Sequence, residues 1–207
     1  APLDGAPAAG ARRVMIDLAV RVEAAGGGAV RIVHDAAGLD GCREDGALGM
    51  VLHIEGAEAL DPELEDLDSW YAAGLRSVGP VWSRQNAFAY GVPFRFPSSP
   101  DIGPGLSDAG RRLVDRCNEL GIVVDVSHMN AAGFWCVAER SRAPLVASHS
   151  NAHALSPASR NLTDDQLDAI AASDGLVGIN FAVMFVRADG ADEPDTAVAE
   201  VVRHMTY

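Results

Sequence analysis

Short apolar runs alternate with longer amphipathic segments along the chain. The short runs are continuously apolar and often β-branched, which is typical of strands covered on both faces. Six such runs are predicted to be strands: residues 29–33, 49–54, 75–79, 122–127, 145–148 and 176–180. The amphipathic segments are predicted to be helices: residues 12–25, 60–72, 107–120, 130–141, 163–172 and 195–204.

Two of the predicted helices carry end signals. Ser107 is a favourable N-cap residue, and Gly121 follows the same helix as a stop signal. Thr163 and Gln166 have the spacing of a capping box. These helix ends should be set by local sequence alone.

Strands and helices that alternate with short connections indicate a parallel α/β domain. No repeat of fixed period and no linker divides the chain, so residues 1–207 are predicted to form a single domain. Six strands fit either an open doubly wound sheet or part of an eight-stranded barrel. A Gly-x-Gly-x-x-Gly motif after the first strand would favour the nucleotide-binding open sheet, and the sequence has none.

One long connection interrupts the alternation of predicted strands and helices. Residues 80–106 are rich in proline and glycine and show no helical period. Long loops without secondary structure inside a compact domain are usually functional. We expect this segment to be an active-site loop.

Three metal-ligating side chains fall at the ends of predicted strands. Alternation along the strands places Glu55, His128 and His149 last on their faces. In a parallel α/β barrel these ends form the floor of the active site. A carboxylate with two imidazoles suits a divalent metal, zinc first. The alternative is that each histidine is a hydrogen-bonded residue at the edge of the core.

The acidic residues after Glu55 need no metal-binding or catalytic role. Seven carboxylates and no basic residue lie between Glu55 and Asp68. A solvated helix face explains all of them except Glu55. Glu55 differs because a buried carboxylate without a partner is unfavourable.

Composition excludes several function classes. The chain has 207 residues, 48% of them hydrophobic and 22% charged, which is enough for one sizeable core. A net charge of −13 leaves no basic patch for nucleic acid. All 16 basic residues are arginine, so Schiff-base chemistry and a P-loop lysine are excluded.

The cysteines and the start of the chain bear on location. Cys42, Cys117 and Cys136 lie far apart, which argues against a disulfide scaffold and favours a reducing compartment. No apolar run is long enough for a membrane helix, and the first residues do not resemble a signal peptide. We therefore expect a cytoplasmic protein. The chain starts without methionine, so either it is processed or its beginning is missing.

Four segments together resemble the membrane (renal) dipeptidase family, peptidase family M19. They are HIEGAEAL, AGLRSVGPVW, GLSDAGRRLVDRCNELGIVVDVSH and APLVASHSNAHALSPASRNLTDDQL. The resemblance runs from about residue 12 to the last residue. It implies a (β/α)8 barrel with two zinc ions that cleaves dipeptides, often with a D-residue at the C-terminal position, through a water that bridges the metals. Some members also open β-lactam rings.

The resemblance also assigns roles to single residues. Glu55 is similar to the catalytic carboxylate that bridges the two zinc ions, and His128 and His149 to the imidazoles of the second zinc site. Arg160 is similar to the arginine that holds the substrate's C-terminal carboxylate, which a guanidinium fork suits. Without the resemblance, a surface arginine that caps the helix beginning near Thr163 would be the favoured interpretation. Asn180 would line the same pocket, although a hydrogen bond at a strand end explains it equally well. The expected partners are a small dipeptide substrate and a second copy of the chain in a homodimer.

Three departures from the family pattern matter. The His-x-Asp motif that supplies the first zinc site occurs nowhere in the sequence, and neither does the late aspartate segment. Trp82 stands where the family has a substrate-contacting histidine, so it would contact the substrate here. We therefore expect the middle of a longer barrel, with about six of eight strands. The alternatives are a non-catalytic fragment that holds at most one metal, and another metal-dependent amidohydrolase.

Overall fold

The computed structural model describes residues 6–207, in which short strands alternate with helices. The strands are β1 (Val30–Ile32), β2 (Leu48–Met50), β3 (Leu52–Glu55), β4 (Leu75–Gly79), β5 (Val123–Val124), β6 (Val146–Ser150) and β7 (Leu176–Ile179). The helices are α1 (Ala6–Ala25), α2 (Ala36–Asp45), α3 (Leu67–Ala72), α4 (Asp108–Leu120), α5 (Ala131–Arg140), α6 (Asp164–Ala172) and α7 (Val198–Met205). Two short 3₁₀ helices complete the set, η1 (Ala57–Ala59) and η2 (Val183–Phe185).

Every strand ladder is parallel, which confirms the predicted α/β class. β1 pairs with β2, β3 with β4, β4 with β5, and β6 with β7. A single parallel bridge between Asp125 and Val146 links the end of β5 to the start of β6. The carboxyl ends of β3, β4, β5 and β6 therefore face the same side.

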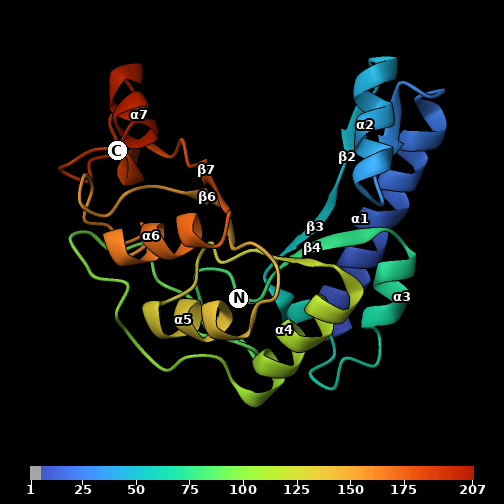
Figure 1. The fold of residues 1–207 in the computed structure, drawn as a ribbon, viewed down its shortest axis with the longest axis horizontal. Helices are drawn as coiled ribbons and strands as arrows, with labels where there is room; N and C mark the ends of the chain where they lie inside the picture. The colour runs from blue at the N-terminus through green and yellow to red at the C-terminus, as the bar shows by residue number, and fades with distance from the viewer. Residues whose placement is uncertain (1–5) are drawn as a thin grey trace.

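The strands follow an open arc rather than a closed barrel. Figure 1 shows α6 below β6 and β7, with α5 and α4 lower still, while the arm with α2 and β2 stands apart from the arm with β7 and α7. Within residues 6–207 no ladder joins β1 to β7. The barrel itself therefore stays a prediction from the family resemblance.

The prediction of one continuous strand over residues 49–54 was wrong, because the structure divides this segment into β2 and β3. Its first part, β2, pairs with β1, whereas β3 pairs with β4. Val51 lies between the two and is half exposed, and the register shifts between Leu52 and His53. The chain thus changes partner in mid-segment, and seven short strands replace the predicted six.

The predicted helix 60–72 was also too long. Asp61 accepts a hydrogen bond from the amide of Glu63, and Asp66 accepts one from the amide of Asp61. Leu64 adopts a left-handed backbone with φ 63°. Acidic side chains that bond to nearby amides compete with helix formation, so α3 starts only at Leu67.

Helix α2 was missed by the sequence analysis. Its segment contains Gly38 and Gly41, which weaken any helical pattern. Its ends are nevertheless well defined, since Asp35 accepts from the amide of Gly38 and Gly46 closes the helix with φ 69°.

The predicted caps of α4 and α6 are confirmed. Ser107 accepts a hydrogen bond from the amide of Gly110, and Gly121 ends α4 in the left-handed conformation. Thr163 and Gln166 form the capping box of α6. The remaining helices α5 and α7 and strands β1, β4 and β7 lie within a few residues of their predicted ranges.

The main core lies between β3–β5 and the helices that cover them. Helix α4 buries Gly110, Leu113, Val114 and Cys117 on one face, at the spacing of a single helical stripe. Leu75, Val78 and Phe134 belong to the same buried cluster. This packing holds the strands whose ends carry the candidate ligands.

None of the helices in the described part of the chain is both long and apolar enough to cross a membrane.

Candidate metal centre

Glu55, His128 and His149 meet at one point. The Oε1 atom of Glu55 lies 2.8 Å from Nε2 of His128 and 3.0 Å from Nε2 of His149. The two Nε2 atoms are 2.9 Å apart. Three ligand atoms from separate segments of the chain therefore form one small triangle. Among the described residues this is the cluster of histidine, cysteine and acidic side chains that could hold a metal ion.

Two strands and one turn position these side chains. Glu55 is the last residue of β3, and His149 is the fourth residue of β6, as the alternation predicted. His128 is different, because β5 ends at Val124 and His128 lies in a turn beyond it with φ 69°. The expectation that His128 closes a strand was therefore wrong, although its side chain still reaches the cluster.

The cluster is open on one side. The side chain of His128 is 5% exposed, that of His149 is 30% exposed and that of Glu55 is 43% exposed. A buried imidazole thus forms the floor, while the carboxylate and the second imidazole border the solvent. A ligand can approach the three atoms without any change in the fold.

Each imidazole has a serine hydroxyl at its far nitrogen. Nδ1 of His128 lies 2.7 Å from Oγ of Ser83, which comes from the 80–106 loop. Nδ1 of His149 lies 2.7 Å from Oγ of Ser148, which in turn donates to the buried carboxylate of Asp125. Sequence reasoning missed all three of these residues. Ser148 and Asp125 stand beside the predicted ligands, in the ASHS and VDVSH segments, whereas nothing local marks Ser83.

The electrostatics of the triangle favour an ionised Glu55 and a neutral His128. The adjacent imidazoles of His128 and His149 hold the pKa of Glu55 well below its ordinary value. Burial lowers the pKa of His128, and the positive charge of Arg160 acts in the same direction against the opposing hydrogen bond to Glu55. Burial also lowers the pKa of His53, which lies 3.8 Å from Asp125.

These residues fit a divalent metal ion. A ligating imidazole must offer an unprotonated nitrogen, and a second hydrogen bond at its other nitrogen normally orients it. Both histidines present Nε2 to the cluster and engage Nδ1 with serine. One anionic oxygen and two imidazole nitrogens are a usual ligand set for zinc.

Arg160 is buried beside the cluster. Its guanidinium donates to the carbonyl oxygen of His149 at 2.9 Å and to the hydroxyl of Ser150 at 3.3 Å. Its Nε atom is buried and has no hydrogen-bond partner among the described residues. Burial lowers the pKa of Arg160 to about 10. A buried cation whose described hydrogen-bond partners are neutral is suited to an anionic ligand.

Trp82 and Asn180 have different surroundings. The indole ring of Trp82 lies 5.9 Å from the ring of His128 and 5.5 Å from that of Phe94, so it lines the approach to the cluster. The side-chain oxygen of Asn180 accepts from the amide of Ala182, and its backbone is paired with Asn151. These hydrogen bonds hold Asn180 at the strand end, and its place in a substrate pocket stays a prediction.

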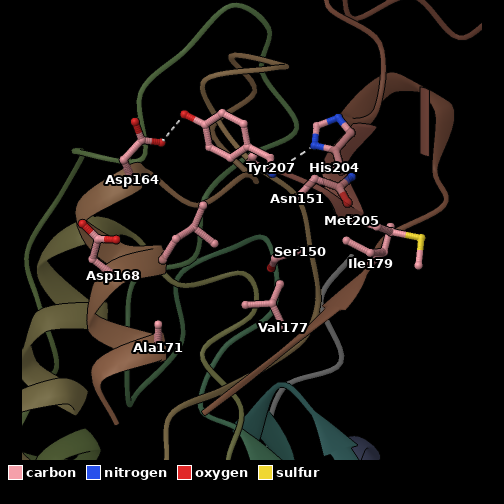
Figure 2. A pocket seen from close by; sticks show the side chains of 12 residues that line it. Ser150, Asn151, Asp164, Asp168, Ala171, Val177, Ile179, His204, Met205 and Tyr207 are labelled. Atoms are coloured by element: carbon pink, nitrogen blue, oxygen red, sulfur yellow. Dashed lines mark hydrogen bonds between the residues drawn. The ribbon is translucent and has the colours of Figure 1, made fainter. Parts of the chain in front are cut away.

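A separate hollow of about 820 Å³ lies between α6, β7 and α7. Figure 2 shows its lining, with Tyr207 reaching towards Asp164 and His204 on the opposite side. It contains none of the three candidate ligands. We place the candidate site at Glu55, His128 and His149, because metal binding requires several ligand atoms close together. The volume of the hollow alone is no evidence of a metal site.

The chain is similar to a known family and to several known proteins. Residues 4–207 match the family model described as membrane dipeptidase (peptidase family M19). An uncharacterized protein in the pqqA 5' region of Klebsiella pneumoniae is 52% identical over 180 residues, which are 87% of this chain and 66% of that protein.

Two solved structures are also similar. A metallo peptidase from Rhodobacter sphaeroides, liganded with a phosphinate mimic of the dipeptide L-Ala-D-Ala, is 49% identical with a TM-score of 0.91, over 93% of this chain and 55% of that one. The dipeptidase AC, a metallo peptidase of family M19, is 47% identical with a TM-score of 0.93, over 100% of this chain and 60% of that one. The chain thus spans between about half and two thirds of the length of these relatives.

Proposed function

This chain belongs to the membrane dipeptidase family, peptidase family M19, and on that premise we propose that the complete protein is a zinc-dependent dipeptidase. The observation that carries the proposal is the convergence of Glu55, His128 and His149 on one point. Glu55 would be the anionic ligand, and the two histidines would be neutral nitrogen ligands. Zinc bound there would supply Lewis acidity to a peptide carbonyl and to the water that attacks it.

The chain's own residues would hold the substrate. Arg160 would bind the carboxylate at the C-terminal end of the dipeptide, because a guanidinium fork matches a planar carboxylate. Its buried, unpartnered Nε supports this role. Trp82 would pack against the substrate beside His128, and the 80–106 loop that carries it would limit access of bulk water.

The first substrate to test is L-Ala-D-Ala. The related Rhodobacter sphaeroides structure holds a phosphinate mimic of this dipeptide. A D-residue at the C-terminal position is also what the family resemblance implies. We propose that this chain's site accepts the same class of dipeptide.

The experiment measures hydrolysis of L-Ala-D-Ala by the full-length protein, with the released D-alanine as the readout. We expect activity that a chelator abolishes and that zinc restores. His149→Ala and Glu55→Gln should each lower activity at least about 100-fold, since each removes a metal ligand. His34→Ala, which changes a histidine outside the cluster, should leave activity within about twofold. Equal activity in the wild type and His149→Ala would overturn the proposal.

A second function is supported by one observation. The described residues bring together a single cluster of candidate ligands, whereas two zinc ions are implied by the family resemblance. A non-catalytic barrel that binds one metal, or a different metal-dependent amidohydrolase, would fit this count. Zinc stoichiometry of the full-length protein separates the possibilities. Two ions per chain favour the dipeptidase, and one ion without hydrolysis favours the binding protein.

The cytoplasmic location and the homodimer stay predictions from the sequence. Light scattering on the purified full-length protein tests the second of them.

A further inference from the structure

We infer that Ser148 and Asp125 are positioning residues that hold His149 in the tautomer whose Nε2 lone pair faces Glu55 and His128. This inference rests on the proposed function, because it concerns how the chain prepares a ligand for the metal. Its starting point is a continuous chain of contacts from Asp125 through Ser148 to His149.

The buried carboxylate of Asp125 fixes the direction of these hydrogen bonds. One of its oxygens accepts from the amides of Ser127, at 3.0 Å, and Ser148, at 2.9 Å. The other accepts from the hydroxyl of Ser148 at short range. Asp125 is 1% exposed, and these hydrogen bonds outweigh its burial and keep its pKa below the ordinary value. An ionised carboxylate can only accept, so the hydroxyl hydrogen of Ser148 points to Asp125.

The orientation of Ser148 then determines the tautomer of His149. A serine hydroxyl has one hydrogen, and Ser148 uses it on Asp125. Towards His149 its oxygen can only accept, at 2.7 Å from Nδ1. Nδ1 must therefore carry the ring proton of a neutral imidazole. The lone pair is left on Nε2, the atom that lies 3.0 Å from Glu55 and 2.9 Å from His128.

The second histidine lacks this constraint. Ser83 lies 2.7 Å from Nδ1 of His128, and within the described chain no carboxylate accepts from Ser83. Its hydroxyl can donate or accept, so it does not select one tautomer of His128. The Asp125–Ser148 relay is thus specific to His149. The backbone of His149 is held as well, because its amide donates to the hydroxyl of Ser127.

The relay is built at the junction of two strands. Asp125 follows β5 and forms the parallel bridge to Val146 at the start of β6. Its carboxylate therefore ties the end of β5 to the residue that precedes His149. Positioning residues of this kind typically contribute about 10–100-fold to metal affinity.

The test uses four variants of the full-length protein. Ser148→Ala removes the relay, and Ser148→Thr keeps the hydroxyl at an exposed position. Asp125→Asn keeps the shape of the acceptor but adds a donor. Ser156→Ala is the matched control, because Ser156 is buried and its hydroxyl has no partner among the described residues.

Two readouts do not depend on activity. The first is zinc affinity from competition with a chromophoric chelator. The second is the tautomer of His149 in the metal-free protein, from long-range nitrogen–proton correlations in NMR spectra. We expect Ser148→Ala to weaken zinc binding about 10–100-fold and to replace a single Nδ1–H tautomer with a mixture. Ser148→Thr should restore both, and Ser156→Ala should change neither.

Unchanged zinc affinity and an unchanged tautomer in Ser148→Ala would overturn the inference. Asp125→Asn tests the same relay from its other end, and circular dichroism checks that this variant folds. If it does not fold, the test rests on Ser148→Ala and Ser148→Thr. A wild-type protein that binds zinc but cleaves no dipeptide would contradict the proposed function and leave the tautomer measurement valid. The two failures are therefore distinguishable.

Discussion

The guanidinium of Arg160 donates a hydrogen bond to the backbone carbonyl oxygen of His149, at a distance of 2.9 Å. The residue proposed to hold the substrate's carboxylate is thereby attached to the strand that carries a proposed metal ligand. Substrate anchor and metal ligand share one rigid support, β6. A shift of β6 should therefore displace both Arg160 and His149.

Arg160→Lys should impair binding of dipeptides with a free C-terminal carboxylate. Lysine keeps the charge but loses the fork and is less suited to a buried site. A charge-assisted hydrogen bond contributes about 1.5–3 kcal/mol, so kcat/KM for L-Ala-D-Ala should fall about 10–100-fold. Steady-state kinetics of the full-length protein measure this.

A C-terminally amidated dipeptide is the control substrate for Arg160→Lys. It has no carboxylate to lose contact with, so the variant and the wild type should cleave it at similar rates. An equal loss on both substrates would show that Arg160 acts only through the structure of β6.

Gly91→Ala should displace the 80–106 loop. A Cβ atom at this position would lie 1.7 Å from the carbonyl oxygen of Trp82. Overpacking of this kind costs about 1–3 kcal/mol or more. Gly91 also bridges to Met129, next to His128, so zinc affinity should fall together with the free energy of unfolding.

Gly41→Ala is the matched substitution for Gly91→Ala. Gly41 lies in α2, and a Cβ atom there meets nothing within 4 Å. The change should stabilise the protein by about 0.5–1 kcal/mol, because alanine restricts the unfolded chain. Urea unfolding of both variants tests the pair; a destabilised Gly41→Ala or a stable Gly91→Ala would contradict the packing described here.

His204→Leu should loosen the end of α7. The buried imidazole accepts from the amide of Ala152 at 3.1 Å and lies 2.9 Å from the carbonyl oxygen of Val186, to which its other nitrogen donates. Leucine would leave both backbone groups unpaired, which costs about 1–3 kcal/mol. Met205→Ala, at an exposed neighbour, should change the free energy of unfolding by less than about 0.5 kcal/mol.

Cys117 should make stability fall at alkaline pH. Burial raises the pKa of its thiol from an ordinary value of 9.0 to about 12. The folded state therefore keeps a proton that the unfolded state releases above about pH 9. Its contribution is complete below pH 9 and is lost as the pH rises towards 12, at no more than about 1.4 kcal/mol per pH unit.

Urea unfolding between pH 8 and pH 11 measures this effect of Cys117. The slope of the unfolding free energy against pH should be smaller in Cys117→Ala than in the wild type. Parallel slopes would mean that the thiol ionises equally in both states.

The sequence predicted those features that depend on neighbours along the chain. The caps at Ser107 and Thr163 use amides within a few residues, so their motifs are sufficient. Alternation along a strand likewise placed Glu55 at the end of β3. Local turn geometry explains where prediction failed, since Asp61 and Asp66 accept from amides in a turn that leaves Leu64 in the left-handed conformation, which an α-helix does not tolerate.

Only the tertiary structure decided which distant residues meet. Ser83 reaches His128 across 45 positions, and Asp125 reaches Ser148 across 23. Arg160, which without the family resemblance would have been interpreted as a surface residue that caps a helix, is buried against β6. Residue types and spacing by themselves determined the candidate ligands Glu55, His128 and His149. Their partners depend on how parallel strands and the 80–106 loop pack together, because a hydrogen bond between distant segments requires the whole fold to bring its atoms within 3 Å.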